Sequence, residues 1–508
     1  MKKFFVSWLC VALAMAASAQ TLNKKMGNPT MEEMTMTECA YDKDANAVVL
    51  YEDFDVAIVS TIGLKLQLTF KRRIKILKEE GLDFANVTLR LRDYEAGGGD
   101  EDHLQDLKAF SYNLENGKVV KTKMSNDMVS KKRLNDSFVS TEFTIPQAKV
   151  GSVIEYQYKV MRDALFDLPT WIAQSTCPVN YTHFRIAMPE EFSYRVNQTG
   201  SAQLEAKSDE EANTRLDTKD IIHDFVGTNL PALPKDNEYI YCSRDFATKV
   251  TCELRNINIP GYVYKDYTTS QADVMDMLMK SEVFGGRMKQ KNPFKDEMAA
   301  AGIASLPTVM EKAVACAKLL KSHLRWNKEY ALTANSQSKV RKEGTGDNAD
   351  LNFIMMSMLN DAGVESSAVL MSRRSRGRLP YMPSIDALNT FVVAFADENG
   401  DLHFYDASAE NGYIDALPTD LNVDRAILLQ RNGHFQDVSL QNNIKRRTSV
   451  MIDASLSADG LITGTCTYTH RENAALRFRN AWEAKNDSAA YVAELAADNN
   501  IDITEYST

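Results

Sequence analysis

The sequence predicts an α+β protein with a β-rich, sandwich-like N-terminal domain, then an α+β core, and then the start of a C-terminal β-containing domain. Three observations predict this class. Apolar residues alternate with other residues over positions 64–70, which is the period of a half-buried strand. An Asn-Gly turn at 116–117 lies between two short strand-like runs and is typical of a hairpin. Farther along, apolar residues recur at helical spacing over positions 351–362.

The chain is 508 residues long, which gives room for roughly two to four domains. In chain order we predict a signal peptide at 1–19, a β-rich domain at 46–235, a connecting region at 239–298, an α+β core at 299–430 and the start of a C-terminal domain at 446–508. The last apolar pattern stops abruptly at the end of the sequence, so we expect the C-terminal domain to be truncated.

The N-terminus has the three parts of a secretory signal. Lys2 and Lys3 form a charged start, an apolar run follows over 6–17, and small residues end it at Ala19. We therefore predict cleavage near Ala19–Gln20 and a periplasmic or secreted protein. No later stretch is long and apolar enough to cross a bilayer, so no membrane span is predicted after cleavage.

Charge and cysteine usage exclude several classes of partner. Removing Lys2 and Lys3 leaves 57 basic against 69 acidic residues, a net charge of −12. An acidic exported protein is a poor candidate for binding nucleic acid or anionic membranes. The six mature cysteines contain no C-x-x-C pair, which gives no zinc site. The sequence leaves two alternatives open: a disulfide between Cys242 and Cys252, or free buried thiols.

The predicted core is organised around residues 344–408. Asp347 and Asn348 are both suitable helix N-caps, because a short side-chain oxygen accepts hydrogen bonds from the first turn. Gly363 ends the helix, and three short strands follow. We expect these strands at 367–373, 391–396 and 402–406, the last two joined by a hairpin turn at 398–400.

This order of elements resembles the core of the transglutaminase-like superfamily, relatives of papain-type thiol enzymes. The family pattern is Gly-x-Cys-x-Asp opening a helix, a strand beginning Asn-His, and a strand ending in Asp. In this sequence Asn348 stands at the cysteine position and Thr390 at the histidine position, whereas Asp406 matches the acid. The stretches 110–119 and 150–156 resemble the β-rich domain of unknown function that precedes such cores in exported bacterial proteins.

The replaced residues carry the chemistry of the family. A cysteine at a helix N-terminus reacts as thiolate, with a histidine as its base and a carboxylate to orient the histidine. A carboxamide is not a usable nucleophile and threonine is not a base near neutral pH. Cys316 is expected to pack in a helix, and His403 to face away from Asp406, because side chains three apart on a strand lie on opposite faces. We therefore expect no catalytic residue and no cofactor.

We predict several candidate ligand-binding residues in and near this core. They are Trp326, Asn327, Tyr330, Asp347, Asp350, Arg373, Arg374, Arg376 and Arg378. The aromatic residues either line a cleft or only pack on the core. The four arginines form either a solvated loop or a loop that binds a carboxylate or sulfate group. The three aspartates of the core lack the spacing of a calcium loop, so no metal is predicted.

These residues lead to three functional hypotheses. The preferred one is an exported, catalytically inactive transglutaminase-like protein that binds a peptide, a glycan or a partner protein through its degenerate cleft. The second is a cysteine-independent hydrolase or transamidase that uses carboxylates such as Asp347, Asp350 or Asp406. The third is a structural module of the cell envelope.

Overall fold

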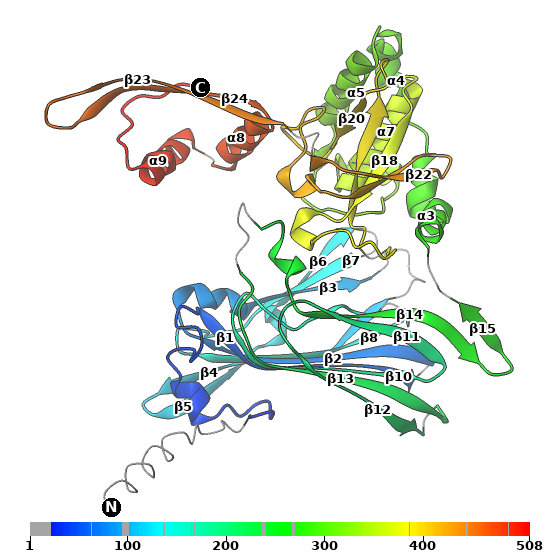
Figure 1. Ribbon diagram of the computed structural model, residues 1–508, viewed down its shortest axis with the longest axis vertical. Coiled ribbons are helices and arrows are strands. Elements are labelled where there is room, and N and C mark those ends of the chain that lie inside the picture. Colours follow the sequence, from blue (N-terminus) through cyan, green and yellow to red (C-terminus); the bar gives the residue numbers. More distant parts are fainter. Residues whose placement is uncertain are drawn as a thin grey trace, which may run out of the picture. The chain divides into compact units, whose positions relative to one another are not determined.

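The computed structural model describes residues 22–508 except 62, 94–100, 136–137, 164, 166–167, 215, 235–239, 267–269, 386, 442–444 and 486. The predicted signal peptide lies outside the described residues. The chain divides into two compact units, which are described separately (Figure 1). The first is Met1–Lys235 with Ala247–Asp266, and the second is Asp236–Phe246 with Tyr267–Thr508.

The first unit is built almost entirely from strands. They are β1 (Ala47–Thr61), β2 (Gly63–Ile76), β3 (Asn86–Arg92), β4 (Asp102–Glu115), β5 (Lys118–Lys123), β6 (Val129–Asn135), β7 (Phe138–Thr144), β8 (Val153–Arg162), β9 (Trp171–Ile172), β10 (Val179–Pro189), β11 (Phe192–Thr199), β12 (Glu205–Asn213), β13 (Thr218–Leu230), β14 (Lys249–Ile259) and β15 (Val263–Asp266). The largest sheet has eight strands in the order β12-β13-β10-β1-β2-β8-β4-β5. Its strands pair antiparallel except for β1 and β10, which are parallel.

A ladder of aromatic side chains crosses one face of this large sheet. The cross-strand registers align Phe225, Phe184, Phe54, Phe70 and Tyr158 over five neighbouring strands. Neighbouring rings lie 5.2 to 6.4 Å apart, which is the range of favourable aromatic pairing. The apolar alternation read from residues 64–70 therefore marks the core face of β2.

A second sheet, formed by β11, β14, β15 and β9, packs on this aromatic face. Trp171 of β9 stacks on Phe184 with ring centroids 5.2 Å apart. Residues 249–259, which the sequence analysis placed in a connecting region, form β14 and pair antiparallel with β11. β14 also pairs with β15 and β9, so all its strand partners lie in the first unit and the strand belongs there. The third sheet has the order β3-β7-β6.

The opposite face of the large sheet is covered by the N-terminal segment, residues 22–45. This segment contains helix α2 (Met31–Thr35), capped by Thr30 in a capping box with Glu33. Beneath it lies Arg73 of β2, with no exposed surface, bonded to Glu155 (2.6 Å) and Glu33 (2.8 Å). Lys75 donates to the carbonyls of Met34 (2.7 Å) and Gly151 (2.6 Å), and burial lowers its pKa to about 8.

The second unit mixes helices and strands. The helices are α3 (Gln271–Lys280), α4 (Lys295–Ala300), α5 (Val309–His323), α6 (Gln337–Glu343), α7 (Asn348–Asp361), α8 (Asn473–Ala484) and α9 (Ser488–Asn499). The strands are β16 (Arg325–Trp326), β17 (Thr345–Gly346), β18 (Ser366–Met371), β19 (Thr390–Ala396), β20 (Leu402–Tyr405), β21 (Ala426–Leu429), β22 (Phe435–Val438), β23 (Arg446–Leu456) and β24 (Ile462–Glu472). Five of them form a sheet in the order β20-β19-β18-β21-β22. An α+β fold with a large β-rich N-terminal region is thus what the structure contains.

Helix α7 is the centre of the second unit. The sequence predicts one apolar face over 351–362, but every residue from Asn348 to Leu359 is buried. A helix enclosed on all sides must satisfy each polar side chain internally. Asn348, Asp350, Asn352 and Ser357 all have hydrogen-bond partners within the unit. These polar residues form the site described below.

The described helices include none that is long and apolar enough to cross a membrane. The six cysteines among the described residues have free thiols, so no bridge joins Cys242 and Cys252.

Candidate functional site at the start of helix α7

The first turn of α7 is held by two aspartates. Asp347 is the N-cap, and its carboxylate accepts a hydrogen bond from the Asp350 backbone N–H at 2.9 Å. The Asp350 carboxylate in turn accepts a hydrogen bond from the Asp347 backbone N–H at 3.0 Å, which completes a capping box. Both side chains are buried. Of the two N-cap candidates in the sequence, Asp347 is therefore the cap, and Asn348 is the first residue of the helix.

Asn348 uses its side chain to join three parts of the chain. Its Nδ2 donates to the Thr390 hydroxyl at 2.5 Å and to the Phe391 carbonyl at 3.4 Å. Its Oδ1 accepts from the Ala331 backbone N–H at 2.6 Å. Asn348 and Thr390 each have no exposed surface. The two residues that the sequence analysis aligned with the family's thiol and imidazole are thus hydrogen-bonded to each other in the interior.

The segment 327–335 covers this pair from outside. The Asn348 backbone N–H donates to the Glu329 carbonyl at 3.2 Å, and the Asn335 backbone N–H donates to Asp350 at 2.7 Å. Together with the bond from Ala331, these contacts attach the segment to the helix start at three points. The attachment closes the start of α7 to solvent.

Asp406, directly after β20, is the third buried member of the cluster. Its Oδ1 accepts from the Ser408 hydroxyl at 2.7 Å, from the Ser408 backbone N–H at 3.1 Å and from Asn352 Nδ2 at 3.4 Å. Its Oδ2 has no hydrogen-bond partner among the described residues. Burial raises the pKa of the Asp406 carboxyl, and the bonds from Ser408 and Asn352 oppose that change only in part.

Neither the nearest histidine on β20 nor the helix cysteine serves this cluster. His403 Nδ1 lies 2.7 Å from the Asp415 carboxylate, and its Nε2 lies 3.7 Å from that of Asp397. Cys316 is fully buried in the core of α5, and burial raises the pKa of its thiol to about 12. A buried thiol in apolar surroundings stays protonated and is a poor nucleophile.

The aromatic candidates lie next to the start of the segment 327–335, here called the cover segment, and within it. Trp326 is half-buried against the core, and its Nε1 donates to the Glu329 carbonyl at 2.8 Å. Tyr330 meets Trp326 edge-to-face with centroids 5.0 Å apart, and the Arg373 guanidinium lies 4.3 Å from the centre of the Tyr330 ring. Asn327 is exposed, and its Oδ1 accepts from the Glu329 backbone N–H at 2.8 Å. These contacts hold the conformation of the cover segment.

The arginine loop is partly neutralised inside the second unit. Arg373 bonds to Asp420 at 3.2 Å, and Arg378 bonds to Asp424 at 2.8 Å. Arg374 donates to the carbonyls of Tyr241 and Ile240. Arg376 and Arg378 are exposed, whereas Arg373 and Arg374 are half-buried. The first two arginines of the loop therefore anchor it, and the last two face solvent.

Sequence reasoning missed Asn352, which holds β19 and the end of β20 together. Its Nδ2 donates to the Phe391 carbonyl at 2.8 Å, and its Oδ1 accepts from the Ala407 backbone N–H at 2.8 Å. The available signal was a second asparagine four residues after Asn348 on an otherwise apolar helix, since positions four apart lie on one face. The hydrogen bond from Ala331 to Asn348 could not be predicted from the residue at position 331, because Ala331 contributes only its backbone N–H.

The arrangement holds its polar side chains in hydrogen bonds within the interior. Asp406 is 1% exposed, and Asn348 and Thr390 are 0% exposed, so a substrate carbonyl cannot reach them in this conformation. Two N–H groups of the first turn of α7, which could otherwise bind an anion, already have partners: that of Asp350 donates to Asp347 and that of Asn348 to the Glu329 carbonyl.

One family model matches the chain, a domain of unknown function with a solved structure (DUF3857), over residues 65–222. The match lies in the first unit and ends before the α7 site. Among curated proteins, none matches the sequence. A Parabacteroides distasonis crystal structure described as "a putative protease" has a similar fold. Its TM-score is 0.51 at 12% identity, and the alignment covers 81% of this chain and 78% of that one.

At this identity the likeness shows the fold alone. An M1 zinc metallopeptidase from Deinococcus radiodurans aligns with a TM-score of 0.18 at 8% identity, over 46% of this chain and 54% of that one. A similarity that low supports no statement about this protein.

Proposed function

We propose that the protein is exported and that its second unit is a transglutaminase-like module without catalytic activity, which binds a peptide or partner protein. The observation that carries the proposal is the closed Asn348–Thr390 pair. A thiol enzyme needs a sulfur anion and a base that reach the substrate. Here a carboxamide and a hydroxyl occupy those positions, bonded to each other at 2.5 Å and covered by the segment 327–335.

The state of Asp406 supports the same proposal. In a thiol triad the carboxylate orients the histidine by accepting its N–H. Asp406 Oδ2 is buried without a hydrogen-bond partner, and the threonine side chain is too short to act as that donor in place of a histidine. An acid left without its base is what loss of the histidine would leave behind.

Exposed side chains of the loop 373–382 give the proposed contact surface. Tyr381 is 87% exposed and carries the Arg425 guanidinium 4.8 Å from its ring centre. Arg376 and Arg378 lie on the same loop and face solvent. Tyrosine and arginine dominate the binding energy of protein interfaces, because they combine apolar area with directed hydrogen bonds. Arg373 and Arg374 fix the loop through their internal partners.

The carboxylate hydrolase is the weaker proposal. A raised pKa at Asp406 suits a general acid, but the side chain is 1% exposed and no second carboxylate is bonded to it. Asp347 and Asp350 are committed to the capping box.

Loss of catalysis is tested with the mature protein in amidase, peptidase and transamidase assays. We expect no turnover above buffer in the wild type, in Asn348→Ala or after iodoacetamide treatment. Robust turnover that disappears in Asn348→Ala would refute the proposal.

Binding is tested by cross-linking the mature protein to native envelope extract and identifying the cross-linked peptides. We expect cross-links on the loop 373–382, and their loss in the double variant Arg376→Ala, Tyr381→Ala. The matched control is Tyr262→Ala, which removes a tyrosine 88% exposed in the first unit. Cross-links that persist in the double variant would favour a purely structural envelope module, and recovery of glycan alone would point to a saccharide ligand.

A further inference from the structure

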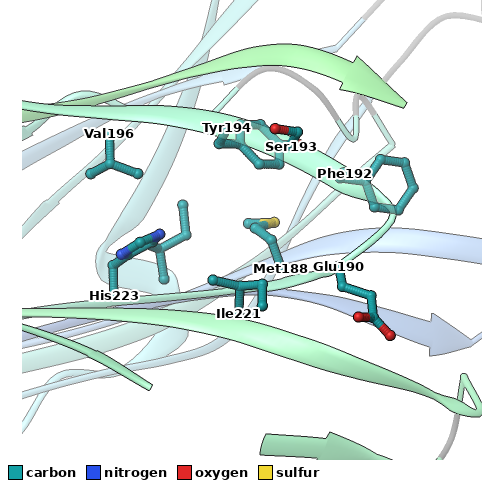
Figure 2. Close-up of a pocket in the computed structure, with 9 residues that line it drawn as sticks. Met188, Glu190, Phe192, Ser193, Tyr194, Val196, Ile221 and His223 are labelled. Carbon is teal, nitrogen blue, oxygen red and sulfur yellow. The ribbon is translucent and has the colours of Figure 1, made fainter. Parts of the chain in front are cut away.

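The first unit contains a cavity between its two larger sheets (Figure 2). Its volume is about 180 Å³. Figure 2 shows Met188 of β10 and Ile221 of β13 on one side, facing Tyr194 and Val196 of β11 on the other. Ile186 completes the floor. The cavity therefore lies where the core faces of the two sheets separate.

Facing side chains usually interdigitate and leave few spaces larger than one water molecule. Here the two core faces leave a pocket that is partly open to solvent. Elsewhere on the same face, Phe184 and Val56 have no exposed surface, whereas Val196 and Ile221 next to the cavity are only half-buried. Apolar walls give water few hydrogen bonds, so an apolar occupant is favoured over water.

Two polar side chains lie at opposite ends of the cavity, and Ser193 and Tyr194 lie between them. His223 is at one end, hydrogen-bonded through Nδ1 to the Ser208 hydroxyl at 2.8 Å, and burial lowers its pKa. Glu190 is at the other end, and it is exposed. No lysine or arginine lines the cavity among the described residues. Near neutral pH the lining thus carries one negative charge, which disfavours an anionic ligand.

The strand register gives the length of the floor. Ile186 pairs with His223, and Met188 pairs with Ile221. From Ile186 to Pro189, the last residue of β10, the strand advances about 10 Å, at ~3.3 Å per residue. An extended chain of roughly eight methylenes has this length, since carbon–carbon bonds of ~1.5 Å at tetrahedral angles advance by less than their full length.

We propose that this cavity binds a small amphiphile with one aliphatic chain and a cationic amine, the chain lying on Ile186, Met188 and Ile221 and the amine at Glu190. The walls select the chain by burial of apolar surface, and the carboxylate selects the head group. The site is in the unit that matches a domain of unknown function, and it is independent of the function proposed for the second unit.

The test uses three ligands of equal chain length at pH 7.5: octylamine, octanol and octanoate. Calorimetric titration of the mature protein should give saturable binding of octylamine. Octanol should bind two- to fivefold more weakly and octanoate more weakly again, because an exposed carboxylate contributes a modest, salt-screened attraction. Shortening the amine to hexylamine should weaken binding about fourfold per methylene removed.

Two variants locate the site. Val196→Phe fills the cavity and should abolish binding of all three ligands, whereas the control Val120→Phe, at a 40% exposed position of β5, should leave it unchanged. Glu190→Gln should lower octylamine binding to the level of octanol and leave octanol unaffected. Circular dichroism and thermal unfolding of each variant establish that it is folded.

Three outcomes would overturn the proposal. They are the absence of saturable octylamine binding, octanoate or octanol binding as tightly as octylamine, and unchanged binding in a folded Val196→Phe variant. If Val196→Phe does not fold, Ile221→Phe serves as the second cavity-filling variant with the same expected loss.

Discussion

Arg73 in the first unit and Asp406 in the second are both charged side chains in the protein interior, and their surroundings differ. Arg73 meets two carboxylates, Glu155 and Glu33, and the backbone carbonyls of Asn23 and Lys25. Asp406 has three donors on one oxygen and none on the other.

The two buried charges differ in how well their lost hydration is replaced, and this difference indicates the role of each in the fold. A buried ion is tolerated when opposite charge and hydrogen bonds replace the water it loses. Around Arg73 that replacement comes from Glu155 of β8 and from residues 23–33, so these bonds attach the N-terminal segment to the sheet. Around Asp406 the replacement is incomplete, and burial raises the pKa of the carboxyl. The first charge is structural, whereas the second keeps one carboxylate oxygen without a hydrogen-bond partner among the described residues.

Removing the Arg73 guanidinium should have the largest effect on stability of the substitutions considered. Arg73→Met leaves Glu155 and Glu33 buried without a cation, which should lower the free energy of unfolding of the first unit by about 3–5 kcal/mol. Hydrogen exchange followed by mass spectrometry reads each unit separately. It should show faster exchange in residues 22–36.

The control for Arg73→Met is Arg185→Met. Arg185 is 27% exposed in its side chain and pairs with Asp55 and Glu211, so its loss should cost about 1 kcal/mol or less. Equal effects of the two substitutions would show that the burial of Arg73 does not determine its contribution to the free energy of unfolding.

The second prediction concerns the polar pair of the α7 site. Asn348→Ala leaves the Thr390 hydroxyl and the Ala331 N–H without their partner in the interior, which should destabilise the second unit by about 1–3 kcal/mol. The exchange of amides in 327–335 should accelerate. Asn327→Ala removes an exposed asparagine of the same segment and should change stability by about 0.5 kcal/mol or less. A cover segment that keeps its protection in Asn348→Ala would contradict the closure described here.

The third and smallest effect has the opposite sign. Asp406→Asn removes the buried charge and keeps an oxygen acceptor, so it should stabilise the second unit by about 1 kcal/mol at neutral pH. The folded pKa of Asp406 is raised above its ordinary value of 3.8, so the carboxyl's stabilising contribution is fully present below pH 3.8 and is lost as pH rises through the folded pKa. The gain from the substitution should therefore be larger at pH 8 than at pH 5 in urea unfolding.

Asp420→Asn is the matched control for Asp406→Asn. Asp420 accepts hydrogen bonds from Arg373, from the Ser375 hydroxyl and from the Ser375 backbone N–H, so its charge is compensated. Its substitution should destabilise the protein slightly. A stabilising Asp420→Asn, or an Asp406→Asn gain that does not grow with pH, would argue against the assignment of Asp406 as an uncompensated acid.

The sequence by itself determined the local elements of the core, because their signals are short-range. The helix start at Asp347, the strand near 391–396 and the turn at 398–400 depend on caps, alternation and turn residues within a few positions. The positions of Asn348, Thr390 and Asp406 in these elements followed from the same pattern.

Only the tertiary structure decided what these residues do. That the segment 327–335 closes the α7 start, that Asp406 keeps one oxygen without a partner, and that β14 belongs to the first unit all depend on contacts between distant positions. The cavity between β10, β13 and β11 also arises from how two sheets separate. Such contacts are set by packing and backbone hydrogen bonding across the whole unit, and no local pattern of residues encodes them.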